Sequence, residues 1–201
     1  MSRERYHHDN LKERLIQSGL AILDGEGYEG LTLRKVAKAC GVSQTAPYRH
    51  FANKDELIAA ITQQAMQAFS EQLAQAAAPY EGNPRAQLKH IGVAYVRFFT
   101  ENPAYLRLLF FSDMPGKGDG CGPCEEDHMA EGHPFAIFFR AVERYAATQA
   151  QPLLTRDELL LYCWGLTHGL SALLIGNQLH GLGAQAMPMV ERIIWHEAFL
   201  P

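Results

Sequence analysis

Apolar residues recur three and four positions apart along most of the chain, which is the period of an amphipathic α-helix. The spacing predicts a helix over residues 9–26 and a short one over 33–40, for which Thr32 is a suitable N-cap. Gly41 then supplies a turn, and Ser43 is suited to cap another short helix. Because no segment alternates as a strand would, the sequence predicts an all-α fold.

The rest of the chain keeps the helical period, and polar caps and prolines mark its helix starts. Asn53 is placed to cap a long helix that continues towards Pro79 and would connect two domains. A stretch rich in Gly and acidic residues, over about 113–132, interrupts the pattern. Further helix starts are expected at or near Asn83–Pro84, Asn102–Pro103, Pro134, Thr155 and Pro188.

Together these elements predict about nine helices in two domains. Residues 1–55 would form a three-helix domain that contains a helix-turn-helix, and residues 56–201 a larger helical domain. A length of 201 residues with 47% hydrophobic content is sufficient for a soluble protein with a buried core.

Charge divides the chain into two parts with different expected partners. The whole chain has a formal net charge of −4, with +1 over residues 1–58 and −5 over residues 59–201. From Thr32 to Lys54 there are five Lys or Arg and no Asp or Glu. A cationic helix-turn-helix within an acidic protein is typical of a DNA-binding face.

The second helix of the helix-turn-helix would present polar side chains to DNA. Arg49 can bind guanine through two hydrogen bonds, Gln44 can pair with adenine, and the Thr45 methyl can contact a thymine methyl. Tyr48 is expected to contact phosphate, and packing inside the small domain is the alternative. The predicted DNA-binding residues are Thr32, Gln44, Thr45, Tyr48, Arg49, His50 and Lys54, of which Thr32, His50 and Lys54 are phosphate contacts at the margins.

This stretch resembles the TetR family of bacterial transcriptional regulators, whose signature runs on into Tyr-x-x-Phe-x-x-Lys-x-x-Leu. Here those positions are Tyr48, Phe51, Lys54 and Leu57. A weaker resemblance lies at Trp164, His168 and Gly169, which are similar to a Trp-x-x-x-His-Gly core in one subgroup of TetR ligand-binding domains. Pro47 departs from the commonest pattern, in which an apolar residue stands there. Because proline has no backbone N–H, Pro47 is expected in the first turn of the second helix.

The resemblance implies a regulator that binds double-stranded operator DNA and leaves it, as a repressor, when a small effector binds the C-terminal domain. It also implies a homodimer formed through a four-helix bundle of the last two helices. The segment 159–179 is apolar around most of its circumference, which a surface helix would not be. A wholly internal helix in a monomer is the alternative, but two-fold operators need two reading heads about 34 Å apart.

Aromatic residues of the predicted C-terminal domain are candidates for an effector pocket. Aromatic residues at helical spacing also form ordinary cores, and His168 beside Trp164 is equally readable as a core histidine. The candidates are Tyr95, Phe98, Phe99, Leu106, Phe110, Phe138, Tyr162, Trp164 and His168, with Phe135 and Phe139 as further wall residues.

The acidic stretch contains a compact set of thiol and imidazole groups at Cys121, Cys124, His128 and His133. Such ligands suit zinc or copper, although standard zinc modules separate their ligand pairs by a dozen or more residues. The alternatives are a disulfide switch between Cys121 and Cys124, and an acidic loop with incidental thiols. Catalytic thioredoxin chemistry would need a βαβ setting that the pattern does not supply. A metal- or thiol-responsive regulator is therefore the second functional hypothesis.

Other functional classes receive no support from the motifs. The chain has no paired carboxylates, Ser-His arrangement or phosphate loop, so we expect no enzyme and no required cofactor. No apolar run has the length of a membrane span, and the N-terminus lacks the apolar core of a signal sequence. The expected localisation is cytoplasmic, with no membrane partner.

Overall fold

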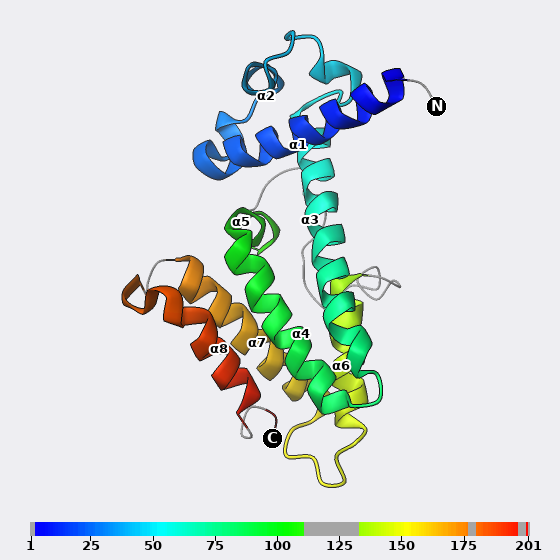
Figure 1. Ribbon diagram of the computed structural model, residues 1–201, viewed down its shortest axis with the longest axis vertical. Coiled ribbons are helices and arrows are strands. Elements are labelled where there is room, and N and C mark those ends of the chain that lie inside the picture. The colour runs from blue at the N-terminus through cyan, green and yellow to red at the C-terminus, as the bar shows by residue number, and fades with distance from the viewer. Residues whose placement is uncertain (1–2, 111–132, 177–179, 197–199, 201) are drawn as a thin grey trace. The chain divides into compact units, whose positions relative to one another are not determined.

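The computed structural model describes residues 3–110, 133–176, 180–196 and 200 (Figure 1). Across these residues the secondary structure is helical throughout, which confirms the all-α prediction. Its helices are α1 (Arg3–Gly30), α2 (Leu33–Cys40), η1 (Pro47–Arg49), α3 (Lys54–Ala77), η2 (Ala78–Tyr80), α4 (Pro84–Glu101), α5 (Pro103–Phe110), α6 (Pro134–Ala146), α7 (Arg156–Ile175), η4 (His180–Gln185) and α8 (Ala186–Trp195).

The predicted polar caps explain where several of these helices begin. The side chain of Thr32 accepts a hydrogen bond from Lys35 N at the start of α2. Asn53 Oδ1 accepts from Glu56 N ahead of α3, and Asn83 Oδ1 accepts from Ala86 N ahead of α4. These bonds satisfy backbone N–H groups that the first turn of a helix leaves unpaired.

The apolar core of the first compact unit is built from apolar residues of α1 and the buried face of α2. Leu15, Val36 and Phe51 are buried in one cluster, and Leu57 and Ile61 at the start of α3 complete it. The burial of these side chains supplies most of the favourable free energy for this small unit. Of the described residues, 3–65 and 104–110 belong to this unit.

Membership of α5 in this first unit differs from the predicted boundary between residues 55 and 56. Leu108 is only 2% exposed and lies in the same apolar cluster as α1 and α2. Arg107 Nε and Nη2 also donate to the two carboxylate oxygens of Asp24 on α1, at 2.6 and 2.8 Å. The apolar period of α5 shows that one face is buried, but not which core buries it.

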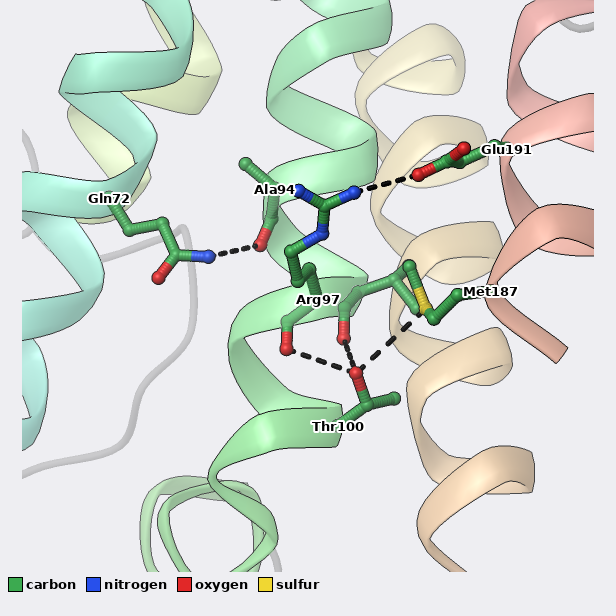
Figure 2. Close-up of polar contacts among 7 residues, drawn as sticks. Gln72, Ala94, Arg97, Thr100, Met187 and Glu191 are labelled. Carbon is green, nitrogen blue, oxygen red and sulfur yellow. Dashed lines mark hydrogen bonds and ion pairs between the residues drawn. The ribbon is translucent and has the colours of Figure 1, made fainter. Parts of the chain in front are cut away.

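In the second unit, which contains residues 66–103 and 122–201, α4 contacts α6, α7 and α8. Polar bonds tie α4 to helices on two sides (Figure 2). Gln72 Nε2 of α3 donates to Ala94 O at 3.3 Å, and Arg97 Nη2 donates to Glu191 Oε1 of α8 at 2.7 Å. Arg97 thus links α4 to the neighbouring α8 through a partly exposed ion pair.

A buried lysine holds the C-terminal end of α8. Lys89 Nζ donates to Trp195 O at 3.0 Å and to His196 O at 3.2 Å, and it lies 5.7 Å from the Trp195 ring centroid. The last carbonyls of a helix lack partners within the helix and carry partial negative charge, so an ammonium group there is favourable.

The helix α7 is buried along one face only. Leu159, Cys163, Thr167 and Ser171 form its buried stripe, at four-residue spacing. Leu161 on the outward side is 67% exposed. By length and composition α7 could cross a membrane, with a mean hydropathy of 1.3, but one such helix is weak evidence because core helices of soluble proteins meet the same criterion.

Candidate nucleic-acid interface and effector region

The turn of the helix-turn-helix forms as predicted. Gly41 has φ 66° and ψ 32°, a left-handed conformation that glycine adopts without the strain of a Cβ. Its N–H donates to Lys38 O at 3.1 Å, and Val42 N donates to Ala37 O at 3.0 Å. These bonds close the C-terminal end of α2, and the partly buried Val42 side chain packs against the core cluster of the first unit.

The short helix predicted after Ser43 is present as a 3₁₀ helix that begins only at Pro47. The recognition segment, which we define as residues 43–51, consists of tight turns and the short 3₁₀ helix η1. Ser43 Oγ lies 3.2 Å from Thr45 Oγ1 and caps no helix. Pro47 stands at the first position of η1, as expected for proline, but its missing N–H falls where a regular α-helix would need a donor. The described residues therefore contain eight α-helices, compared with about nine predicted.

Four of the predicted DNA-binding side chains are exposed on the recognition segment. Gln44, Thr45 and Arg49 are exposed, and Tyr48 is 52% exposed although it is aromatic. A large aromatic side chain in this position gains nothing from the core. Its hydroxyl and ring edge are instead accessible to a polar partner such as phosphate.

The three predicted phosphate contacts at the margins have different surroundings. Thr32 is exposed and caps α2, and the half-buried His50 lies with its ring centroid 6.3 Å from that of Phe51. Lys54 Nζ lies 3.6 Å from the Tyr28 ring centroid and donates to Tyr28 O at 3.4 Å. The ammonium group of Lys54 is therefore held in place before any ligand binds.

Tyr28, which the sequence did not single out, also orients the start of α3. Its hydroxyl donates to Asp55 Oδ1 at 2.9 Å, and this hydrogen bond with the carboxylate raises the pKa of Tyr28 above its ordinary value. In the sequence, Tyr28 is only a single tyrosine next to a glycine. In the structure, Gly27 has φ 72° and the regular part of α1 ends there. The spacing of residues along the sequence does not reveal which distant residues Tyr28 contacts.

In the second unit, several predicted pocket residues form an aromatic cluster. Tyr95, Phe98 and Phe99 of α4 surround Phe69 of α3, with ring centroids 5.2, 5.0 and 4.7 Å from it. Phe135 of α6 meets Trp164 of α7 edge-on at 5.5 Å. Phe69 was missed because α3 also carries Leu57, Ile61 and Leu73 at helical spacing, so Phe69 has the pattern of an ordinary core position.

A polar trio lies at the edge of these rings. Tyr95 Oη lies 2.9 Å from His168 Nδ1, and Trp164 Nε1 donates to Tyr95 Oη at 3.4 Å. Burial lowers the pKa of His168 because the low-dielectric surroundings disfavour the imidazolium. The trio thus combines hydrogen-bonding groups with a neutral histidine next to apolar rings.

The remaining pocket candidates lie on α5, α6 and α7. Leu106 and Phe110 belong to the first unit, and Tyr162 is exposed on the outward side of α7. Phe138 is buried on α6, and Phe139 lies 5.2 Å from the Arg156 guanidinium. Aromatic residues at helical spacing can face a core, a pocket or solvent. The sequence alone does not show which of these surrounds each residue.

Three of the four candidate metal ligands, Cys121, Cys124 and His128, lie outside the described residues. The fourth, His133, is the N-cap of α6, and its Nδ1 accepts a hydrogen bond from Phe135 N at 3.3 Å. Of the other cysteines, Cys163 is buried, and burial raises the pKa of its thiol to about 12. Cys163 is therefore a protonated core residue at neutral pH.

An open depression of about 420 Å³ lies on the first unit, a feature that the sequence did not predict. It is lined by side chains of α1 and α2, including Arg14, Ser18 and Cys40. Arg14 Nη2 donates to Cys40 O at 2.6 Å, and Cys40 Sγ lies 3.2 Å from Ser18 Oγ. These bonds fix the end of α2 against α1.

Comparison with known proteins decides the family. The family model described as "Bacterial regulatory proteins, tetR family" matches residues 15–61, which contain α2 and the recognition segment. The model described as "Tetracyclin repressor-like, C-terminal domain" matches residues 88–196, more than half of the chain. The chain belongs to the TetR family. TetR proteins are regulatory proteins and not enzymes, in agreement with the predicted class.

Similarity of this TetR chain to an individual curated protein is confined to a short stretch. It is 42% identical to the class C tetracycline repressor protein of Escherichia coli over 52 residues, which are 26% of this chain and 24% of that protein. The chain thus matches about a quarter of the length of that curated relative.

Solved structures of similar fold extend over nearly the whole TetR chain. A TetR family transcription regulator from Marinobacter aquaeolei VT8 has a TM-score of 0.70 and 15% identity, and covers 95% of this chain and 96% of its own. A protein of unknown function from Rhodococcus sp. RHA1 has a TM-score of 0.68 and 24% identity, with 92% and 93% covered. At these identities the likeness shows the fold alone.

Proposed function

We propose that this TetR protein is a transcriptional repressor that binds double-stranded operator DNA in a sequence-dependent way. The observation that carries the proposal is the recognition segment, where Gln44, Thr45, Tyr48 and Arg49 are all exposed. The stretch from Thr32 to Lys54 contains five cations and no carboxylate. It combines groups that can read base edges with the positive charge that attracts phosphates.

A homodimer would bring two such segments to one operator. The outward side of α7 supports it, because Leu161, Tyr162 and Leu173 are exposed there and no Asp, Glu, Lys or Arg occurs between Leu159 and Ile175. On the same side, a Cβ added to Gly165 or Gly169 would meet nothing within 4 Å. A partner helix could therefore approach this face closely.

The exposed face of α8 adds to the proposed interface. Ile193 of α8 is exposed, as are Leu161 and Leu173 of α7, and exposed apolar side chains on both helices are suited to a shared interface. A second copy is the occupant that a two-fold DNA site requires. The interface of the last two helices would then be isologous, with the same residues contributed by both protomers.

The effector region of the proposal is the aromatic cluster with its polar trio. Tyr95, Trp164 and His168 supply hydrogen-bonding groups, and the surrounding rings supply apolar contact. A neutral histidine suits an uncharged, apolar or amphipathic molecule better than an anion. No cofactor enters this proposal.

Effector binding and DNA binding would be coupled along the chain. The chain passes between the two units within α3, after Ala65, and again at Pro103 before α5. After Pro103, Leu108 packs in the apolar core of the DNA-binding unit, and Arg107 donates hydrogen bonds to Asp24 of α1. Linkage requires an effector that weakens operator binding to be bound more weakly, by the same factor, when operator is present.

The experiment is selection of genomic DNA fragments by the purified protein, followed by affinity measurements at one salt concentration. The proposal predicts enrichment of a common, two-fold symmetric sequence and preference for it over a shuffled fragment of equal length. Fragments retained without any common sequence would contradict sequence-dependent regulation. An effector found by screening must then weaken the affinity of the protein for operator. Operator must weaken the affinity of the protein for the effector by the same factor.

A further inference from the structure

Pro47 occupies an unusual place in the recognition segment. Its side chain is buried, and it stands at the first position of η1, between the exposed pairs Gln44/Thr45 and Tyr48/Arg49. Pro47 is the only residue from 43 to 51 without a backbone N–H. It therefore acts on the DNA interface through the backbone and not through its own side chain.

The backbone hydrogen bonds show the effect of this missing donor. In an α-helix, the N–H of residue 47 would donate to Ser43 O. Here Ser43 O accepts instead from Ala46 N, one residue earlier, at 3.0 Å. Arg49 N donates to Ala46 O at 3.2 Å and His50 N to Pro47 O at 2.9 Å, so these turns also close over three residues. Pro47 O accepts a second bond from Phe51 N at 3.0 Å, which closes over four residues, so the tight turns end at His50.

Tight turns place the four exposed side chains differently from an α-helix. An α-helix turns about 100° and rises about 1.5 Å per residue, whereas a 3₁₀ turn rotates about 120° and rises about 2.0 Å. Within η1, which spans Pro47–Arg49, each residue therefore adds about 20° more rotation and about 0.5 Å more rise than it would in an α-helix.

We propose that Pro47 is a specificity-determining residue of the DNA interface. It holds the recognition segment in tight turns, and this geometry determines which base pairs Gln44/Thr45 and Tyr48/Arg49 can reach together. Non-specific affinity depends on the five cations between Thr32 and Lys54, which a change at Pro47 leaves in place. The inference rests on the proposed DNA-binding function and adds the residue that sets its sequence preference.

The variant Pro47→Ala tests it because alanine restores the N–H and favours the α-helix. Pro84→Ala is the matched control, since Pro84 is also the first residue of a helix, in the other unit, where its N–H would be unpaired in any case. Pro47→Thr restores the same N–H with a side chain of similar size and replaces Pro47→Ala if that variant does not fold. Each full-length variant is used to select fragments from a random-sequence DNA pool.

The proposal predicts that Pro47→Ala enriches a different sequence from the wild type, while Pro84→Ala enriches the wild-type sequence. Affinity of Pro47→Ala for the wild-type fragment should fall at least tenfold, on the order of the cost of one mismatched base pair, with affinity for shuffled DNA changed by less than about twofold. Amide exchange should show a newly protected N–H at residue 47.

Two results would overturn the proposal. One is the same enriched sequence for both proteins with the same ratio of specific to shuffled affinity. The other is an equal loss of affinity for specific and shuffled DNA by a folded variant, which would make Pro47 a support for DNA binding in general. If the wild type itself enriches no sequence, the proposed function fails, and this is seen before any variant is compared.

Discussion

The substitution Leu108→Ala tests whether α5 is part of the DNA-binding unit. Leu108 lies outside residues 1–55, yet it is 2% exposed in the cluster formed with α1 and α2. Truncation to alanine removes three carbon groups, which correspond to about 2.4 kcal/mol of transfer free energy at about 0.8 kcal/mol each. The cavity left behind raises the expected loss to about 3 kcal/mol, within the range of about 2–5 kcal/mol for buried leucines.

The assay is amide hydrogen exchange of the full-length protein, which resolves the stability of α2 from that of the second unit. A loss of about 3 kcal/mol corresponds to exchange about 100-fold faster for amides of α2 that exchange through opening of the first unit. Leu153→Ala is the control, because Leu153 is 81% exposed and its truncation should change stability by less than about 0.5 kcal/mol. Unchanged exchange in α2, with destabilisation confined to the second unit, would refute the reasoning.

Three further predictions concern the second unit. Leu161→Glu places a charge on the outward face of α7 and should convert the protein to monomers in sedimentation measurements, while Leu153→Glu leaves the dimer intact; monomeric wild-type protein would contradict the proposed interface. Thr155→Ala removes the capping box at the start of α7 and should lower the free energy of unfolding by about 0.5–2 kcal/mol, and an unchanged value would show that the cap adds nothing. The lowered pKa of His168 means that the unfolded chain binds its proton first, so stability should fall as pH decreases through about 6.5. His168→Asn should reduce this fall, and an identical pH dependence in both proteins would show that another group causes it.

Much of the helical framework follows from local chemistry. The bonds made by Thr32, Asn53 and Asn83 depend on residues within a few positions, and Gly41 needs only its own backbone freedom. The DNA-binding face was predicted because a run of cations without carboxylates can be recognised from the sequence without knowing how the helices pack. Family membership was indicated by residues within one continuous stretch.

The features that were not predicted depend on contacts between distant segments or on a balance of local effects. Leu108 is apolar in any helical core, and only packing assigns it to the DNA-binding unit. Tyr162 fits an aromatic pocket by type, but α7 turns it outwards. Pro47 was expected in the first turn of an α-helix, but Ser43 O accepts from Ala46 N, so the chain forms a tight turn before Pro47.

Reading of DNA by the recognition segment is tested most directly by the ratio of affinities for an enriched fragment and a shuffled one. We predict a ratio of about 10³ or more for the wild type. The double variant Gln44→Ala/Arg49→Ala should lower that ratio at least 30-fold, from about 1 kcal/mol or more per base contact, while the equally exposed control pair Gln67→Ala/Arg140→Ala preserves it. A wild-type ratio near one, or a double variant that keeps the wild-type ratio, would contradict the account.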